Sequence, residues 1–468
     1  MPDRHRGERL HLVSTVTTLP QRTRRNTELV LLIFAIGIVL LAYANVGLAT
    51  DGQVPTDLAT LGIGIGVLGL VFHLVLRWRA AYADPLLLPM ATLLNGLGLV
   101  MIHRIDIAKD RTLGEGAALK QLMWSGLSVA CAIGLILLIR DHRRLTRYTF
   151  TMALAGLLLL LLPLFPVIGK NINGSRIWIG IGPFSFQPGE LAKILLTIFF
   201  ASYLVATRDA LSLVGRRVLG FPLPRARDMG PIMIAWLASL AVLVFQRDLG
   251  SSLLFFGLFV AMLYVATERR AWIAIGLLLF AGGALVAWQL FSHLQQRVTL
   301  WLDPFAPGVS DQLAKGLMGM ASGGLLGKGL GQGRPQLTYY AESDFIIPSF
   351  GEELGLVGLM AILALYALIV ERGLRTGIGA RDGFGKLLAT GLAFSLALQI
   401  FVVVGGVTRV IPLTGLTTPF LSAGGSSLLA NWVIVALLLR ISDQARRPVD
   451  QARVAQVGQD ETQVVRTR

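Results

Sequence analysis

The stretch LVLLIFAIGIVLLAYANVGLA, residues 29–49, decides the fold class of this chain. It contains no charged side chain, and about 20 apolar residues in a helix are enough to cross the hydrocarbon core of a bilayer. Similar runs recur along nearly the whole sequence. They predict about twelve spans, at residues 29–49, 57–76, 85–103, 118–139, 146–168, 189–206, 230–246, 249–266, 271–292, 347–370, 386–408 and 417–439. The sequence therefore predicts an all-α polytopic membrane protein.

The composition supports this interpretation and excludes other classes. Of the 468 residues, 54% are hydrophobic and only 15% are charged, whereas about 25% are charged in an ordinary soluble domain. Disordered chains are poor in apolar residues, so disorder of the whole chain is excluded as well. The single cysteine, Cys131, lies inside an apolar run, which excludes a disulfide framework and a cysteine metal site.

The formal net charge of +15 would ordinarily suggest a nucleic-acid-binding protein. Here, however, the Lys and Arg residues lie in short gaps between apolar runs, and every second gap is basic. Arg77 and Arg79, for example, follow the second span. Cytoplasmic loops of membrane proteins carry such an excess of positive charge. We therefore expect a protein of the cytoplasmic membrane with both termini cytoplasmic and no nucleic-acid partner.

One gap, between the ninth and tenth predicted spans, is much longer than the others. Residues 293–346 interleave glycine, aromatic and charged side chains, and long loops in compact domains are usually functional or disordered. We predict a large extracellular loop folded over the bundle. The chain then divides into a membrane domain at residues 29–443 and two polar tails, 1–28 and 444–468, which we expect to be cytoplasmic and disordered.

Two ionisable side chains lie at the outer end of the sixth predicted span, in the stretch QPGELAK, residues 187–193. Pro188 suits the first turn of a helix, and Glu190 and Lys193 are three residues apart and share one helix face. A charged group within a span costs about 2.5–3.5 kcal/mol on insertion scales and so points to function. Two interpretations stay open. The pair locks two helices together, or Lys193 and the helix N-terminus attract an anion such as a diphosphate.

Two further motifs carry a weaker signal. Asp248 follows a tight turn in QRDLG, residues 246–250, and suits a capped helix start. The stretch SGGLLGKGLGQG, residues 322–333, contains Lys328 and looks like a phosphate-binding loop, but Ser322 and Gly329 break the pattern G-x-x-x-x-G-K-[ST]. The failed pattern therefore argues against an ATPase. What remains is a flexible loop whose backbone can approach a ligand closely.

Asp344 stands where the long outer segment re-enters the membrane, in YYAESDFII, residues 339–347. Apolar neighbours lower the local dielectric constant, and burial of this kind raises the pKa of a carboxyl group and makes it a better base. A helix N-cap is an equally good interpretation of the spacing. Both possibilities stay open on the residues alone.

In order and spacing, these motifs resemble those of the bacterial SEDS family (shape, elongation, division and sporulation), which comprises RodA, FtsW and SpoVE. The resemblance covers roughly residues 29–443. It rests on GSRIW at 174–178, QPGELAK at 187–193, DLG at 248–250, SGGLLGKG at 322–329, SDFI at 343–346, GEELG at 351–355 and GGS at 424–426. The chain is most similar to the RodA type with two additional N-terminal spans. Among its departures, Glu342 stands where the family commonly has His, and Ala423 replaces a usual Tyr.

The resemblance implies a peptidoglycan glycosyltransferase that polymerises lipid II into glycan strands at the outer face of the cytoplasmic membrane, for cell elongation and shape. Undecaprenyl diphosphate would be the leaving group, and direct displacement would invert the anomeric centre. A class B penicillin-binding protein would be the transpeptidase partner, alongside other components of the elongation or division complex. The family is also thought to need a divalent cation, Mg²⁺ or Mn²⁺, for which Asp344 and Glu190 are candidate ligands.

The resemblance also implies roles for single residues. Asp344 falls on the family's essential aspartate, which favours the general base over the N-cap. The predicted substrate-binding residues are Trp178, Glu190, Lys193, Asp248, Arg297 and Lys328. Of these, Lys193 and Arg297, together with the helix end and the cation, would hold the departing diphosphate.

Two other functions compete with the polymerase. A lipid II flippase would use Glu190 and Lys193 to line a passage for the headgroup, but it needs polar residues through the full thickness of the bundle. A non-catalytic scaffold of the cell-wall synthesis complex would recruit the transpeptidase through lipid-facing spans. In a scaffold, Asp344 would be dispensable.

Overall fold

The computed structural model describes residues 23–111, 116–172, 175–181, 184–208, 217–218, 221–222, 226–246, 248–306 and 311–448. Long α-helices make up most of this part of the chain. Their bounds are α1 Arg25–Thr50, α2 Leu58–Arg79, α3 Leu87–Ala108, α4 Ala117–Leu138, α5 Thr149–Leu161, α6 Pro188–Ala206, α8 Ala226–Phe245, α9 Leu249–Thr267, α10 Ala271–Leu290, α11 Ser292–Leu302, α12 Gln312–Gly323, α13 Ile346–Gly379, α14 Gly383–Val407 and α15 Gly425–Arg446. Three short 3-10 helices are η1 His142–Tyr148, η2 Leu162–Leu164 and η3 Pro335–Leu337.

The predicted membrane spans are confirmed as long apolar helices. Within the described residues, eleven helical segments are long and apolar enough to cross a membrane. Helix α8, with its apolar part at Met233–Val242, occupies the remaining predicted span. The observed bounds differ from the predicted ones by a few residues at most ends. At the N-terminal end of the bundle, α1 begins at Arg25 rather than at residue 29. Residues 1–22 and 449–468, most of the two predicted tails, lie outside the described residues.

Two small antiparallel sheets interrupt the helical pattern, and hydropathy gave no sign of them. Strands β1 Gly169–Ile172, β2 Ser175–Ile181 and β3 Phe184–Phe186 form a sheet in the order β1-β2-β3. Strands β4 Arg217–Val218 and β5 Phe221–Pro222 form the other. The three-stranded sheet joins the η2 end of the fifth span to the start of α6, so it lies beside the site-bearing end of α6.

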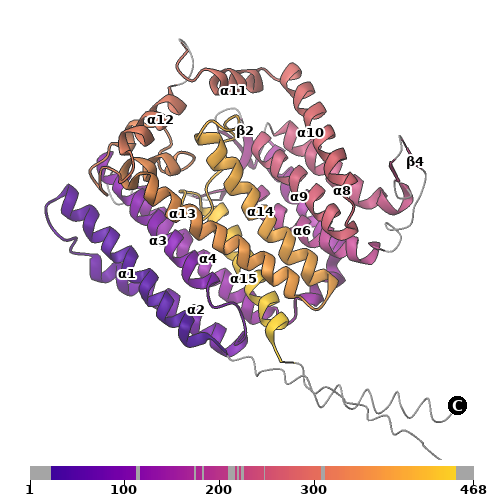
Figure 1. Ribbon diagram of the computed structural model, residues 1–468, viewed down its shortest axis with the longest axis horizontal. Helices are drawn as coiled ribbons and strands as arrows, with labels where there is room; N and C mark the ends of the chain where they lie inside the picture. Colours follow the sequence, from indigo (N-terminus) through magenta and orange to yellow (C-terminus); the bar gives the residue numbers. More distant parts are fainter. Residues whose placement is uncertain are drawn as a thin grey trace, which may run out of the picture.

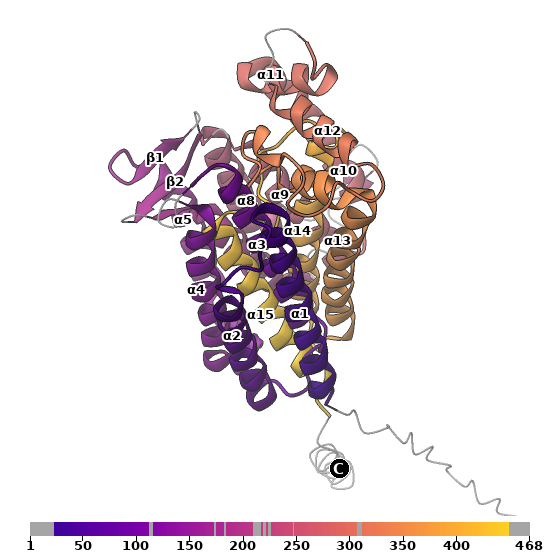
Figure 2. The ribbon, with the colours of Figure 1, turned by 90° about the vertical axis from the view of Figure 1, so that its left-hand side faces the viewer.

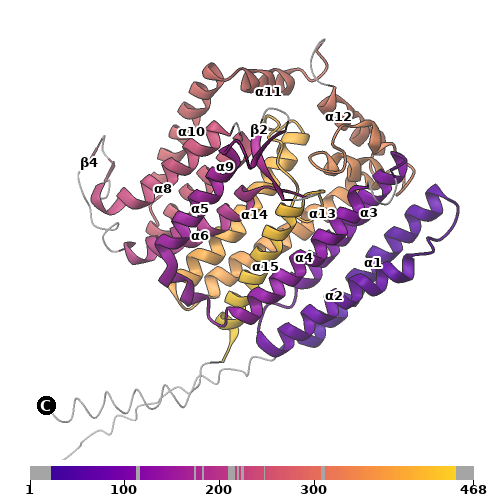
Figure 3. The same ribbon diagram turned by 180° about the vertical axis from the view of Figure 1, so that it is seen from behind.

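The centre of the bundle is formed by α3, α6, α14 and α15, which are largely buried. Helices α1 and α2 run along one edge, and α8 and α10 run along the opposite edge (Figure 1). The view from behind shows the same order, with α15 and α4 side by side (Figure 3). Helix α10 exposes nearly its whole apolar surface, including Leu277 and Leu278. In a bilayer this surface faces lipid, since apolar exposure at such length is typical of membrane helices.

The long segment between α10 and α13 is not one uninterrupted loop. It contains α11, α12 and η3, and Figure 2 shows α11 and α12 beyond one end of the bundle. The start of α1 and the end of α15 both lie at the other end (Figure 2). The two ends of the membrane domain therefore share one side of the bundle. Which side faces outward stays a prediction.

Helix α13 has a break near its start. Gly355 has φ +66°, so the helix axis is interrupted between the GEELG motif and the long remainder of the helix. Only glycine adopts this conformation without strain. A side chain at Gly355 would also collide with the backbone of Leu325 and Gly327, because the glycine-rich stretch packs directly against the break. The break thus makes room for the stretch that contains Lys328.

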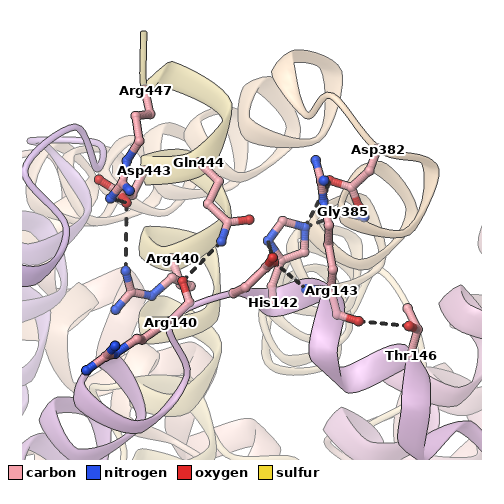
Figure 4. Close-up of polar contacts among 11 residues, drawn as sticks. Arg140, His142, Arg143, Thr146, Asp382, Gly385, Arg440, Asp443, Gln444 and Arg447 are labelled. Atoms are coloured by element: carbon pink, nitrogen blue, oxygen red, sulfur yellow. Dashed lines mark hydrogen bonds and ion pairs between the residues drawn. The ribbon is translucent and has the colours of Figure 1, made fainter. Parts of the chain in front are cut away.

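Polar contacts tie the helices together at the end where α15 terminates (Figure 4). His142 and Arg143, at the start of η1, both contact the carboxylate of Asp382 before α14, with His142 Nε2 at 3.1 Å and Arg143 Nε at 3.2 Å. On α15, the side-chain amide of Gln444 donates to the backbone carbonyl of Arg140, 3.1 Å away. Arg140 and Arg143, in the basic gap after the fourth predicted span, therefore also hold helix ends together.

Candidate active site

Asp344 lies in a tight turn directly before α13. The carbonyl of Tyr340 accepts hydrogen bonds from the backbone N–H groups of Ser343, at 3.0 Å, and Phe345, at 3.1 Å. The N-cap of α13 is Phe345, with no side-chain cap, so the N-cap interpretation of Asp344 is wrong. The side chain keeps some exposure, yet desolvation raises the pKa of Asp344 to about 7, against the opposing effects of the Arg297 charge and a hydrogen bond with Ser343. Asp344 can therefore exchange a proton near neutral pH.

Arg297, on α11, places a positive charge next to this carboxyl group. Its Nη1 donates to the backbone carbonyls of Leu413, at 3.0 Å, and Thr414, at 2.9 Å. The guanidinium and the carboxyl group come close to each other at Gly415. A methyl group added to this glycine would lie 3.7 Å from both Arg297 Nη2 and Asp344 Oδ2. Burial lowers the pKa of Arg297, while the charges of Asp248 and Asp344 raise it. The guanidinium nevertheless stays protonated at neutral pH, as arginine does in proteins.

Asp248 caps the start of α9. Its Oδ1 accepts a hydrogen bond from the backbone N–H of Ser251 at 2.9 Å, which confirms the capped turn that the sequence predicts. Burial raises the pKa of Asp248, and the nearby charges of Arg297 and Glu190 also act on it. Asp248 thus links the Asp344–Arg297 pair electrostatically to the start of α6. Arg247, the preceding residue in the motif, lies outside the described residues.

Replacing Asp248 by Ala is expected to lower the free energy of unfolding by about 1 kcal/mol, because the first turn of α9 loses its cap. Asn keeps the accepting oxygen, so Asp248→Asn should retain nearly all of this stability. Thermal unfolding of both variants in detergent measures the difference. Equal stabilities for the Ala and Asn variants would contradict the capping role. Both variants also remove the negative charge beside Arg297, so a loss of activity that they share would show that this charge matters for the reaction.

Glu190 and Lys193 form a buried ion pair on α6. The Lys193 Nζ lies 2.7 Å from Glu190 Oε2, and both side chains are almost fully buried. Lys193 Nζ also donates to the side-chain oxygen of Gln399 on α14, at 2.7 Å. Gln399 in turn donates to the carbonyl of Thr417, at 2.9 Å. The structure therefore favours the ion pair that locks helices together over an open anion site at Lys193.

The glycine-rich stretch around Lys328 contacts α13 through its backbone. The N–H of Lys328 donates to the carbonyl of Glu352 at 3.1 Å, and the N–H of Gly331 to a carboxylate oxygen of Glu353 at 3.0 Å. The Lys328 ammonium group lies 3.1 Å from Glu352. These two amides therefore bind a backbone carbonyl and a carboxylate of the GEELG motif, so the expectation that the loop backbone is free to approach a ligand is wrong for them. Substrate binding by the half-exposed Lys328 side chain stays a prediction.

Trp178 lies on β2, the middle strand of the three-stranded sheet, where it pairs with Lys170 on β1. Its side chain is half-buried. The sheet is at the same end of the bundle as α11 and α12 (Figure 2). The backbone N–H of Arg176, on the same strand, reaches the carbonyl of Gln246 beside Asp248, at 3.4 Å. The sheet is therefore connected to the site, and a substrate contact for Trp178 stays a prediction.

Several residues that the sequence analysis did not single out support the site. On α3, Arg104 Nε lies 2.9 Å from Glu353 and its Nη2 donates to the Gly333 carbonyl at 2.6 Å. Lys109 lies 2.6 Å from Glu342, two residues before Asp344. Arg104 and Glu353 could have been found from the sequence, because a charged side chain within an apolar span points to a functional or paired residue. Nothing in the sequence pairs Lys109 with Glu342.

Taken together, Asp344, Arg297 and Asp248 form one charged group, with the Glu190–Lys193 pair beside Asp248. Lys328 belongs to a second group with Glu352. Within the described residues, no three His, Cys, Asp or Glu side chains are grouped as ligands for a metal ion. Mg²⁺ is commonly bound by one or two carboxylates together with substrate phosphates. Of the two candidate ligands, Asp344 fits that donor set, whereas the carboxylate of Glu190 is engaged by Lys193.

A family model described as "Cell cycle protein", which covers FtsW, RodA and SpoVE, matches residues 85–447. The chain is 51% identical over 438 residues to "Peptidoglycan glycosyltransferase RodA" of Mycobacterium tuberculosis, covering 92% of this chain and 93% of the relative. It is 34% identical to "Stage V sporulation protein E" of Bacillus subtilis, covering 78% of this chain and 98% of the relative. The match to the mycobacterial relative spans 438 residues, which is more than the chain contains from residue 85, where the family model begins, to its end. The mycobacterial relative therefore also matches part of the region with α1 and α2.

Solved structures show the same fold. One comes from "Structural coordination of polymerization and crosslinking by a peptidoglycan synthase complex", with a TM-score of 0.63, 28% identity and coverage of 78% of this chain and 99% of that chain. Another is the crystal structure of RodA, the rod shape determining protein of Thermus thermophilus, with a TM-score of 0.56, 27% identity and coverage of 80% of this chain and 100% of that chain.

Proposed function

Because this chain belongs to the FtsW, RodA and SpoVE family and is a peptidoglycan glycosyltransferase of the RodA type, we propose that it polymerises lipid II with Asp344 as the general base. One observation carries the assignment of the base. The carboxyl group of Asp344 has a pKa of about 7 and faces the guanidinium of Arg297 across Gly415. A base with a pKa near the working pH is the most effective one.

The reaction joins two lipid-linked disaccharides. Asp344 takes the proton from the 4-hydroxyl group of the acceptor sugar, and this oxygen attacks the anomeric carbon of the donor. The new glycosidic bond forms as the bond from that carbon to the diphosphate breaks, and the electron pair leaves with undecaprenyl diphosphate. A single displacement of this kind inverts the anomeric centre. Arg297 supplies fixed positive charge for the departing diphosphate, and it is held in place by the Leu413 and Thr414 carbonyls.

A divalent cation is part of this proposal. The diphosphate oxygens of the substrate would bind it, as substrate phosphates commonly bind Mg²⁺. Asp344 is assigned to the base and not to the cation, because a carboxylate bound to Mg²⁺ could not take up the proton of the acceptor. The cation would neutralise charge on the leaving group. Glu190 is not retained as a ligand, since Lys193 lies 2.7 Å from its carboxylate.

We also propose the outer face of the cytoplasmic membrane as the place of the reaction. Helix α11, which carries Arg297, lies at the end of the bundle opposite the start of α1 and the end of α15 (Figure 2). Asp344 lies close enough to Arg297 for its charge to act on the carboxyl group, so cytoplasmic termini would put Asp344 outside. A class B penicillin-binding protein is the proposed partner, supported by the similarity to a solved synthase complex of polymerisation and crosslinking. Polymerisation of purified lipid II by the protein with its transpeptidase tests the whole proposal.

The polymerisation rate is expected to rise with pH between about 6 and 8, because the Asp344 base acts only when deprotonated. Its pKa of about 7 means that roughly half of the molecules carry the proton at that pH. Initial rates at saturating lipid II, measured across this range at constant ionic strength, give the profile. A rate independent of pH in this range would contradict Asp344 as the group that titrates.

A further inference from the structure

We propose that the ion pairs of Glu342 with Lys109 and Arg111 are a clamp that positions Asp344 for catalysis. We call Asp106, Lys109, Arg111 and Glu342 the α3 clamp. The inference rests on the proposed function, in which Asp344 is the base. The members of the clamp are positioning residues that act through the turn containing Asp344.

The contacts of the clamp are short and join parts of the chain that are far apart in sequence. Glu342 Oε2 lies 2.6 Å from Lys109 Nζ, and Glu342 Oε1 lies 3.1 Å from Arg111 Nη1. Arg111 also contacts Asp106 Oδ1 at 3.1 Å. The other oxygen of Asp106 accepts the backbone N–H of Ala118, at the start of α4, at 2.7 Å. The carboxylate of Glu342 is thus anchored to the end of α3 and, through Asp106, to α4.

The backbone around Glu342 is held from the opposite side. The Glu342 carbonyl accepts the N–H of Ala423 at 2.8 Å, and the Ser343 carbonyl accepts the hydroxyl of Ser422 at 2.6 Å. The side chain of Glu342 points to α3, while its carbonyl faces the segment before α15. The turn that carries Asp344 is therefore held by two elements, the end of α3 and the segment before α15. The α3 clamp is the contact made through the Glu342 side chain.

The Glu342–Lys109 ion pair of the clamp is largely shielded from water. The Glu342 side chain is 14% exposed and that of Lys109 is 23% exposed. Burial alone would raise the pKa of Glu342, but the hydrogen bond and charge of Lys109 and the charge of Arg111 outweigh burial and lower it. Glu342 therefore stays ionised at the pH at which Asp344 titrates. Removing one partner of an ion pair that is shielded from water costs more than removing one from an exposed pair, because the remaining charge is left without compensation.

The charges of the clamp compensate one another. Lys109 and Arg111 balance Glu342 and Asp106, so the intact clamp is electrically neutral. The charge that faces Asp344 directly is Arg297 on α11, with Asp248 of α9 next to it. Glu342→Gln would leave the clamp with a net positive charge, whereas Lys109→Met would leave it with a net negative charge.

The test compares lipid II polymerisation by the full-length protein with its transpeptidase for Glu342→Gln, Lys109→Met and the double variant. We expect each single variant to lower kcat roughly tenfold to hundredfold, with KM for lipid II nearly unchanged, because small misplacements of a reacting group have effects of this size. The double variant should lose no more than a single one, since both remove the same pair. Lys109→Arg keeps the charge and should keep most of the rate.

A second readout separates positioning from general damage. This readout is the combination of a lowered kcat with an unchanged KM, together with the rescue of the rate by Lys109→Arg, which a merely structural role would not produce. Asp311→Asn is the matched control, because Asp311 forms an ion pair with Lys315 at 2.6 Å in the same outer segment but lies outside the clamp. It should leave kcat and KM unchanged.

Three outcomes would overturn the inference. They are wild-type kcat in both single variants, additive losses in the double variant, and a rise in KM for Lys109→Met alone, which would mean direct substrate binding. Asp344→Asn is measured alongside. If it polymerises lipid II at the wild-type rate, the proposed function fails. If it is inactive while the clamp variants behave as wild type, only the clamp fails.

Discussion

Replacing Asp344 by Asn is expected to abolish glycan chain formation while the protein remains abundant and folded. A general base contributes about 10²- to 10⁴-fold to a rate, and the Asn amide has nearly the shape of Asp but cannot take up a proton. The turn at Asp344 is built from backbone hydrogen bonds of Tyr340, Ser343 and Phe345, and none of them uses the carboxyl group. The loss should therefore appear in activity alone.

The measurement is the amount and length of glycan made from purified lipid II by the detergent-solubilised protein with its transpeptidase. Asp311→Asn makes the same chemical change at an exposed carboxylate of the outer segment and should be fully active. Chain formation at the wild-type rate by Asp344→Asn would show that another group acts as the base. It would also reopen the scaffold interpretation, in which Asp344 is dispensable.

Replacing Lys193 by Met is expected to destabilise the protein by about 3–5 kcal/mol, because it leaves the carboxylate of Glu190 buried without its partner. Both side chains of the pair are almost fully buried, and the side-chain oxygen of Gln399 also loses its donor. Such a loss should lower the abundance in membranes and the midpoint of thermal unfolding in detergent. Activity should fall in proportion to the folded protein that remains.

The control for Lys193→Met is the double variant with Glu190→Gln. Removing both charges takes away the uncompensated carboxylate, so the double variant should recover much of the stability that the single variant loses. A different result would restore the anion-site interpretation. If Lys193→Met is as abundant and as stable as the wild type but cannot polymerise lipid II, then Lys193 binds the diphosphate.

Features that depend on neighbouring residues could be predicted from the sequence. Hydropathy located the membrane helices, Pro188 marked the start of α6, and Asp248 was recognised as a cap. The Glu190–Lys193 pair follows from helical spacing. Each of these is fixed within one or two turns of helix, and local sequence contains that information.

Features that depend on packing could not be predicted. The break at Gly355 exists because the glycine-rich stretch lies against α13, and glycines that suggested a ligand loop make room for that contact. The three-stranded sheet is made of strands too short to give a strong hydropathy signal. The clamp joins Lys109 to Glu342 across 233 positions in the chain. Nothing in the spacing of the sequence indicates such a partner.

By itself, the sequence determined that this is a multi-pass membrane protein, which family it resembles and which residues carry charge near the site. The tertiary structure decided which partners those charges meet. It showed that Asp344 faces Arg297 rather than capping a helix, and that Lys193 also donates to Gln399, 206 positions away. The physical reason is the range of the interactions. Hydropathy and helix capping act between near neighbours, whereas the cost of burying a charge is offset only by a partner that the fold brings to it.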